Sequence, residues 1–533
     1  MATEGIAQVL YALSPVAATV TVIAALLIWI RTARDLGMHA NLSGTMDHFH
    51  VDAIAIAITD LYYGGSRDYV GLLAVRDILH RHGLIDRSGS AQSDGAAIDR
   101  ALDEASRLDW NAALSSARFI VGLEPGFADL VRLGFRLFGL RIAAISYTIW
   151  MMLGLSCAMF TVAFWHHPGL LWALGGLLAA LHITIFGTEV IDGATPSVAS
   201  KRILGIFAIV PAFHLMMALA IGQDASATQV ILAGGQAFLF AFLLWIRTSV
   251  AWIVVALCLL VLFLCAGRLA GATDIALSLQ AWVGQGLWVV PLWMGVSELV
   301  QVYFRRRIHP CYYSDDFLPA YPKWHPAYVG LAEDAETFHR ARMMNQEDKV
   351  VDENACKAAI HYLGASPAFA NIRKKQRGIR LRPPHISFNI SAFANIKWSL
   401  YEEAVRMAFM DYVKANLRTM PRLYLVLKPL AILRSMKTVL QPLPAYLRAR
   451  PRILPFLLFL GVVTTSSLVQ DPAALLALSL TTGVLLVVSP LPQIWAFSFH
   501  PPGFSVAEPV WLTLFTVWTM ASGVLALLLS VVG

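Results

Sequence analysis

Two aspartates and two histidines lie within six positions, at Asp47, His48, His50 and Asp52. Imidazole and carboxylate groups both bind divalent cations, and a carboxylate can act as a general base. In a helix His48 and Asp52 share one face and Asp47 and His50 another; in an extended segment His48, His50 and Asp52 point the same way. The pattern predicts either a site for a cation such as Mg²⁺ or Mn²⁺, or a catalytic Asp52 with Asp47 second to it. The alternative is a polar cluster that caps the preceding apolar segment.

The composition around this cluster is that of an integral membrane protein. The 533 residues are 57% hydrophobic and only 14% charged. Apolar runs of about 20 residues recur, the length that crosses the hydrocarbon core of a bilayer. This composition excludes a soluble enzyme, and nothing in the sequence predicts a nucleic-acid partner.

Ten apolar runs predict an all-α polytopic membrane protein with about ten transmembrane helices. An odd-even count places the two long polar segments between them on the same side of the membrane. The expected division is a first transmembrane helix at 1–30, a first large loop with the acidic and histidine cluster at 31–141, a bundle of about six helices at 142–303, a second large basic loop at 304–452 and about three C-terminal helices at 453–533. The runs are residues 6–30, 142–165, 170–188, 203–221, 229–246, 249–266, 279–303, 453–469, 473–495 and 509–531.

The two polar segments differ in charge. Residues 31–140 carry 11 arginines, no lysine and 14 carboxylates, whereas residues 305–452 carry 25 basic and 12 acidic residues. A basic surface beside a membrane attracts anionic headgroups or a phosphate-bearing lipid. The patterns also predict helices over 70–80 and 97–108 in the first segment, and amphipathic helices over 398–416 and 421–436 in the second.

Glu124-Pro125-Gly126-Phe127 is followed by Leu130 to Gly139, which leads into the second apolar run. This motif is similar to the end of the first large loop and the entry to the second span in the GT-C superfamily of membrane glycosyltransferases, which includes protein O-mannosyltransferases and aminoarabinose transferases. Tyr401 to Arg406 and Met420-Pro421-Arg422 are similar to the juxtamembrane helices before a late span. The order of one span, a long loop, a bundle and a second large loop agrees as well.

The resemblance implies inverting transfer of a hexose or pentose from a polyprenyl-phosphate donor to a lipid, glycan or protein acceptor. By position Asp52 matches the family's acidic base, with Asp47 second, although Ala53 stands where the family has a second acidic residue. Glu189 and Asp192 match the acidic position after the third span.

The resemblance also implies which residues contact the phosphate and the acceptor. Lys201 and Arg202 would neutralise the leaving lipid phosphate, together with basic residues of the second loop such as Arg305 and Arg306. Snorkelling at the interface explains Lys201 and Arg202 equally well. His325 would lie along the acceptor groove, and aromatic packing is its alternative.

The orientation of the chain stays open at this point. Most arginines next to the spans lie on the side of the two large loops, and positive-inside counting therefore favours a cytoplasmic position for both. The family resemblance requires both loops outside a bacterial-type inner membrane. Two other functions fit the same architecture: an envelope-polysaccharide polymerase or ligase that relies on arginine and histidine, and a non-catalytic scaffold subunit.

Overall fold

The chain forms two compact units of mainly helical structure. One consists of residues 1–307, 439–489 and 507–533, the other of residues 308–438 and 490–506. The five segments expected from the sequence divide the chain by membrane topology, and this grouping by contacts does not test them. The computed structural model describes residues 2–35, 48–63, 70–82, 95–115, 119–121, 125–188, 207–246, 250–271, 286–307, 324–329, 331, 398–496 and 507–532.

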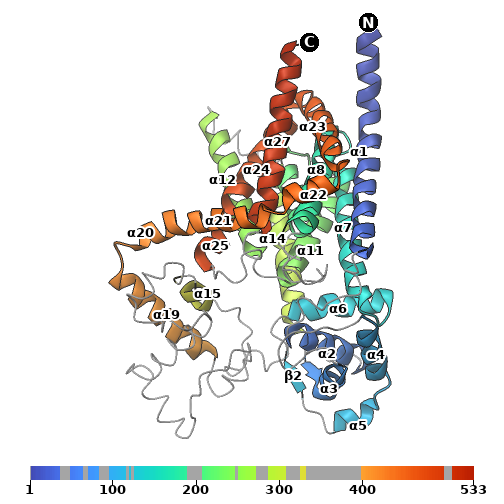
Figure 1. Ribbon diagram of the computed structural model, residues 1–533, viewed down its shortest axis with the longest axis vertical. Helices are drawn as coiled ribbons and strands as arrows, with labels where there is room; N and C mark the ends of the chain where they lie inside the picture. Colours follow the sequence, from blue (N-terminus) through green and yellow to red (C-terminus); the bar gives the residue numbers. More distant parts are fainter. Residues whose placement is uncertain are drawn as a thin grey trace. The chain divides into compact units, whose positions relative to one another are not determined.

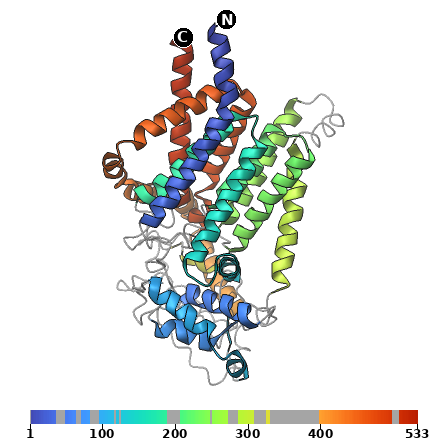
Figure 2. The same ribbon diagram turned by 90° about the vertical axis from the view of Figure 1, so that its right-hand side faces the viewer.

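The first unit is a bundle of apolar helices with a smaller helical group at one end (Figure 1, Figure 2). The bundle comprises α1 (Ala2–Asp35), α7 (Ala143–Ala163), α8 (Pro168–Gly187), α10 (Ile209–Ile221), α11 (Ala227–Ile246), α12 (Ala251–Gly271), α14 (Val289–Arg305), α22 (Leu443–Ala449), α23 (Ile453–Val469), α24 (Pro472–Val488) and α27 (Ala507–Val532). The beginning of α1 and the end of α27 lie together at the end of the bundle away from the smaller group.

Several long apolar helices of the described chain fit an integral membrane protein. Four are long and apolar enough to cross a membrane, Ser14–Asp35, α7, α8 and α11, and a fifth is added if the bent pair Met420–Ala449 and Ile453–Val469 is one span. Shorter apolar helices cover 209–221, 251–267, 472–488 and 509–521. Ten spans therefore remain a prediction.

Packing separates central helices from peripheral ones. In α8 most side chains are buried, and α1, α23 and α27 pack around it. In α1, by contrast, Val20 and Leu27 are exposed, as expected of a helix that faces lipid. The indole of Trp172 in α8 donates a hydrogen bond to Ser14 Oγ of α1 at 2.8 Å, which fixes the register of the two helices.

Helix ends follow local capping rules. Asp471 accepts a hydrogen bond from the backbone N–H of Ala474, and Pro472 occupies the first turn of α24. At Gly222 α10 ends in the left-handed conformation, with φ of 76°. The predicted run 473–495 is wrong in its last part: α24 ends at Val488, and a turn at Ser489 and Pro490 separates it from α25 (Leu491–Ala496), because proline cannot continue the helix.

The smaller group of the first unit contains α2 (His48–Tyr63), α3 (Leu73–Arg81), α4 (Gly95–Ser106), α5 (Trp110–Ser115) and α6 (Pro125–Phe138). Two short antiparallel strands, β1 (Val70–Leu72) and β2 (Phe119–Val121), pair with Gly71 opposite Ile120. The expected helix over 70–80 is therefore wrong at its start, because Val70 to Leu72 pair with a partner strand that the local pattern does not reveal.

In the second unit the structure describes α15 (Trp324–Val329), α19 (Trp398–Ala415), α20 (Met420–Arg422), a π-helical turn at Leu423–Leu427, α21 (Lys428–Leu440) up to the unit boundary, and α25. The short helix α15 packs on both α19 and α25. Lys428 is fully buried; its Nζ donates a hydrogen bond to the carbonyl oxygen of Ile494 at 2.7 Å. The expected helices over 398–416 and 421–436 both form.

Candidate functional site

The helix α2 carries two aspartates on one face. Asp52, Ile56 and Asp60 follow one another at intervals of four residues, which aligns their side chains along the helix. The stretch Ala53 to Ile58 between them is buried and apolar. Asp60 itself is buried, with 9% of its surface exposed, so its charge has to be balanced by neighbouring protein groups.

The helix α6 supplies the counter-charge. It is amphipathic: Phe127, Leu130 and Val131 are buried, whereas Arg136 is exposed. Asp129 and Arg132 are spaced by three residues, so they lie on neighbouring positions of the helix surface. Because α6 packs on α2, α7 and α11, this short polar stretch is enclosed by protein.

Arg132 joins the two aspartates. Its Nη1 donates a hydrogen bond to Asp60 Oδ2 at 2.6 Å, and its Nη2 donates one to Asp129 Oδ1 at 2.6 Å. The side chain of Asp129 is only 2% exposed, and that of Arg132 is 11% exposed. Charge-assisted hydrogen bonds of this length are the strong class, and here one guanidinium holds carboxylates of two different helices.

Two more arginines approach the same carboxylates. Arg307, just after the end of α14, places Nη2 at 3.8 Å from Asp60 Oδ2 and Nη1 at 3.5 Å from Asp129 Oδ1. Arg136 Nη2 lies 3.7 Å from Asp60 Oδ2. We call these five residues, Asp60, Asp129, Arg132, Arg136 and Arg307, the acid–arginine cluster. Among these five side chains the formal charge is +1.

The backbone around Asp129 is held closely. The indole Nε1 of Trp245, at the end of α11, donates a hydrogen bond to Asp129 Oδ2 at 3.1 Å. A Cβ at Gly126 would lie 2.3 Å from the carbonyl oxygen of Trp245, so only glycine permits this approach of α6 to α11. The Pro125-Gly126 pair therefore sets the position of the cluster.

A small cavity lies at the cluster. Its volume of about 10 Å³ suits a single water molecule. Asp60 accepts its hydrogen bond from Arg132 through Oδ2, and within the described residues Oδ1 of Asp60 has no hydrogen-bond partner. The lining residues are Ile56, Ala57, Asp60, Ala128, Asp129, Arg132 and Arg307.

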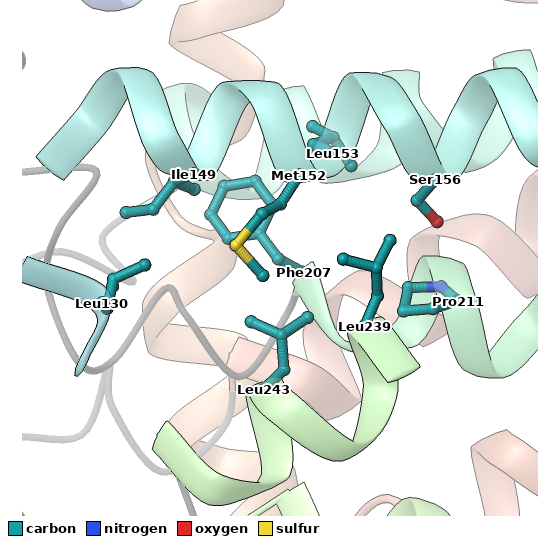
Figure 3. A pocket seen from close by; sticks show the side chains of 9 residues that line it. All are labelled: Leu130, Ile149, Met152, Leu153, Ser156, Phe207, Pro211, Leu239 and Leu243. Carbon is teal, nitrogen blue, oxygen red and sulfur yellow. The ribbon is translucent and has the colours of Figure 1, made fainter. Parts of the chain in front are cut away.

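A second cavity, between α6, α7, α10 and α11, is apolar (Figure 3). Ile149, Met152 and Leu243 point into it, and among its described lining residues the hydroxyl of Ser156 is the one polar side-chain group. Without ionisable groups it offers no acid–base chemistry. The acid–arginine cluster is therefore the better candidate for a reaction site.

Asp52, the predicted base, lies in α2 beside Arg76 of α3. The distance from Arg76 Nε to Asp52 Oδ1 is 3.0 Å, and both side chains are mostly buried. The helix begins at His48, so of the two backbone conformations considered for this stretch the helical one holds from His48 to Asp52. A cation bound to Asp52 would compete with Arg76 for the same carboxylate, which does not favour a metal site there.

The structure describes the other predicted site residues in part. Arg305 and Arg306 are exposed at the end of α14. His48 and His50 lie in α2 and His325 in α15, and their side chains are outside the described part of the chain. Asp47, Glu189, Asp192, Lys201 and Arg202 lie outside the described residues. Among the residues described, no group of three or more histidine, cysteine, aspartate or glutamate side chains is arranged to hold a metal.

We compared the chain with protein-family models, curated proteins and solved structures. None of them matches. The acid–arginine cluster, through its geometry and charge, is therefore the main functional evidence in this chain.

Sequence reasoning did not identify this cluster, although two signals for it are present. Asp60 is a charged residue that follows a buried apolar stretch of its own helix. Asp129 and Arg132 stand three residues apart within a strongly amphipathic segment. Each is a common local pattern, and only the packing of α2 on α6 brings them together.

Proposed function

We propose that the chain is a GT-C-like membrane glycosyltransferase with about ten transmembrane helices. It moves a sugar from a polyprenyl-phosphate-linked donor to a lipid, glycan or protein acceptor, on the extracytoplasmic side of a bacterial-type inner membrane. The observation that carries this proposal is the acid–arginine cluster at the end of an apolar helical bundle. It combines a carboxylate with several guanidinium groups, the two kinds of group that such a transfer needs.

In this reaction Asp60 is a base candidate alongside Asp52. The Oδ1 atom of Asp60 would take the proton from the acceptor hydroxyl. At the same time the oxygen of that hydroxyl forms a bond to the anomeric carbon of the sugar. The bond between that carbon and the phosphate oxygen breaks, and the polyprenyl phosphate leaves with the electron pair. A positioned general base of this kind contributes about 10²–10⁴-fold to the rate.

The arginines of the cluster would bind the phosphate. Arg136 is 56% exposed, so it is accessible from outside the cluster, and exposed Arg305 and Arg306 precede Arg307 in the chain. Guanidinium groups match phosphate oxygens in geometry and stabilise the negative charge that develops on the leaving group. Binding of the phosphate to Arg136 and Arg307 would also weaken their hold on Asp60.

The release of free polyprenyl phosphate tests this proposal, because that product is common to every sugar and acceptor. The full-length protein in native membranes is incubated with a panel of polyprenyl-phosphate hexoses and pentoses. We expect release that falls at least 100-fold in Asp60→Asn, with Arg136→Met raising KM for the donor. An exposed substitution outside the acid–arginine cluster, Arg100→Met in α4, is the matched control. If Asp60→Asn and Asp52→Asn both release product at the rate of the unaltered protein, the carboxylate mechanism is wrong.

A polysaccharide polymerase or ligase is the second candidate, because three arginines gather at the cluster and that class relies on arginine. In that case Arg307→Met should abolish activity while Asp60→Asn remains active. If the envelope glycans are unchanged in Asp60→Asn, Arg136→Met and Arg307→Met alike, and all three variants fold, a scaffold role replaces both proposals.

A further inference from the structure

The helical stretch Met420–Ala449 has an exposed face that no described element covers. Along it, exposed positions recur every three or four residues, which is the spacing of one helix face. Leu425 is 76% exposed and Leu433 is 59% exposed. The opposite face is buried, as Ile432 and Met436 show. Seven of the exposed residues of this stretch form what we call the leucine–arginine face: Arg422, Leu425, Val426, Leu430, Leu433, Arg434 and Lys437.

The charge around this face has one sign. Between Asp411 and Asp471 the chain contains nine lysines and arginines and no acidic residue. Four exposed basic residues, Arg418, Arg422, Arg434 and Lys437, lie within or next to the face. A helix surface that combines exposed leucines with basic residues, and lacks carboxylates, complements a negatively charged apolar boundary.

The stretch leads into an apolar helix. Only Arg450, Pro451 and Arg452 separate Ala449 from α23, which begins at Ile453. Basic residues next to an apolar helix are attracted to anionic headgroups at a membrane surface. In α23 the exposed residues include Leu458 and Phe459, as expected of a helix in contact with lipid.

We infer that the leucine–arginine face is a docking surface for an anionic lipid bilayer. Leu425 and Leu433 enter the boundary between headgroups and acyl chains, while Arg434 and Lys437 contact phosphate groups of anionic lipids. The inference does not depend on the proposed glycosyl transfer. It assigns to this helix a preference for acidic phospholipids, which a packing role alone would not give.

The depth of residue 433 tests the inference in the full-length protein. The five native cysteines are replaced by serine, and a spin label is attached at Leu433→Cys. The protein is placed in nanodiscs of phosphatidylcholine alone or of phosphatidylcholine mixed with phosphatidylglycerol. Collisions of the label with oxygen, which dissolves in lipid, and with a water-soluble nickel complex report its depth. A label at Asn111→Cys, on exposed α5, is the water-exposed reference, and circular dichroism verifies folding.

We expect the label at 433 to be oxygen-accessible, and more so in discs that contain phosphatidylglycerol. Arg434→Glu or Lys437→Glu should each lower the ratio of oxygen to nickel accessibility of the label in those discs at least fivefold. The matched charge reversal Arg100→Glu should leave this ratio unchanged. Equal accessibility to nickel in both lipids would overturn the inference. Shielding from both reagents would overturn it as well, because the face would then pack on protein. Equal oxygen accessibility in both lipids would contradict the recognition of anionic lipid.

Discussion

Arg132 holds Asp60 and Asp129 at the same time, with 2.6 Å between each carboxylate oxygen and a different nitrogen of the guanidinium group. The two aspartates belong to α2 and α6, which are far apart in the sequence. One side chain therefore fixes how these two helices pack, and with it the position of the proposed base.

Loss of this bridge should destabilise the protein strongly. In Arg132→Met the negative charges of two largely buried carboxylates lose their closest positive partner. Breaking a buried ion pair in this way lowers the free energy of unfolding by about 3–5 kcal/mol. We expect a clear decrease in the thermal unfolding temperature in detergent. Arg100→Met, at an exposed position of α4, should change it little. An unaltered unfolding temperature in Arg132→Met would mean that the bridge does not hold α2 on α6.

Gly126 should tolerate no side chain. In Gly126→Ala the added methyl group would meet backbone atoms of Trp245 at 2.3 Å, so α6 has to move away from α11. Overpacking of this kind costs about 1–3 kcal/mol. Gly154 of α7 is the matched control, because a Cβ there meets no atom within 4 Å, and Gly154→Ala should be neutral or stabilising. Equal unfolding temperatures for the two variants would contradict the close packing.

The link between α3 and α4 should weaken in acid. A hydrogen bond from His82, together with the charge of Arg81, lowers the pKa of the Glu104 carboxyl from its ordinary value of 4.5. A carboxyl whose pKa is lower in the folded state stabilises that state above the unfolded pKa. This contribution is lost as the pH falls through the folded pKa.

The expected result is a pH-dependent difference between the unaltered protein and Glu104→Gln. At neutral pH, hydrogen exchange of the α3 and α4 amides should be faster in the variant, and the difference should shrink in the acid range. Asn111→Ala, which removes no charge, serves as the control. A difference that is constant with pH would show that the charge of Glu104 does not stabilise the contact.

Apolar periodicity predicted the helices whose sequence signal is local and does not depend on a distant part of the chain. The runs at 142–165, 229–246 and 453–469 correspond closely to α7, α11 and α23, since hydrophobic length is a local property of the chain. The strand at Val70 to Leu72 was not predicted, because its partner Phe119 to Val121 is distant in sequence. The amphipathic helices before α23 were predicted from the same local signal as the spans.

The site was predictable only in part, for the same reason. The sequence pointed to Asp52, which the structure pairs with Arg76, and to the segment that contains Arg132. It did not predict that Asp60 and Asp129 share one arginine, nor that Arg307 would reach them from the end of α14. These contacts depend on how α2, α6 and α14 pack, and no local pattern encodes that packing.

The side of the membrane that the acid–arginine cluster faces is the most direct test of a transferase that acts outside the inner membrane. A single cysteine at Asn111, exposed in α5 of the same unit, is introduced into the cysteine-free chain. Intact cells with an opened outer barrier are treated with a membrane-impermeant thiol reagent, with a cytoplasmic protein as the control for leakage. We expect labelling without disruption of the inner membrane. Protection until that membrane is disrupted would place the cluster in the cytoplasm and contradict the proposed transfer.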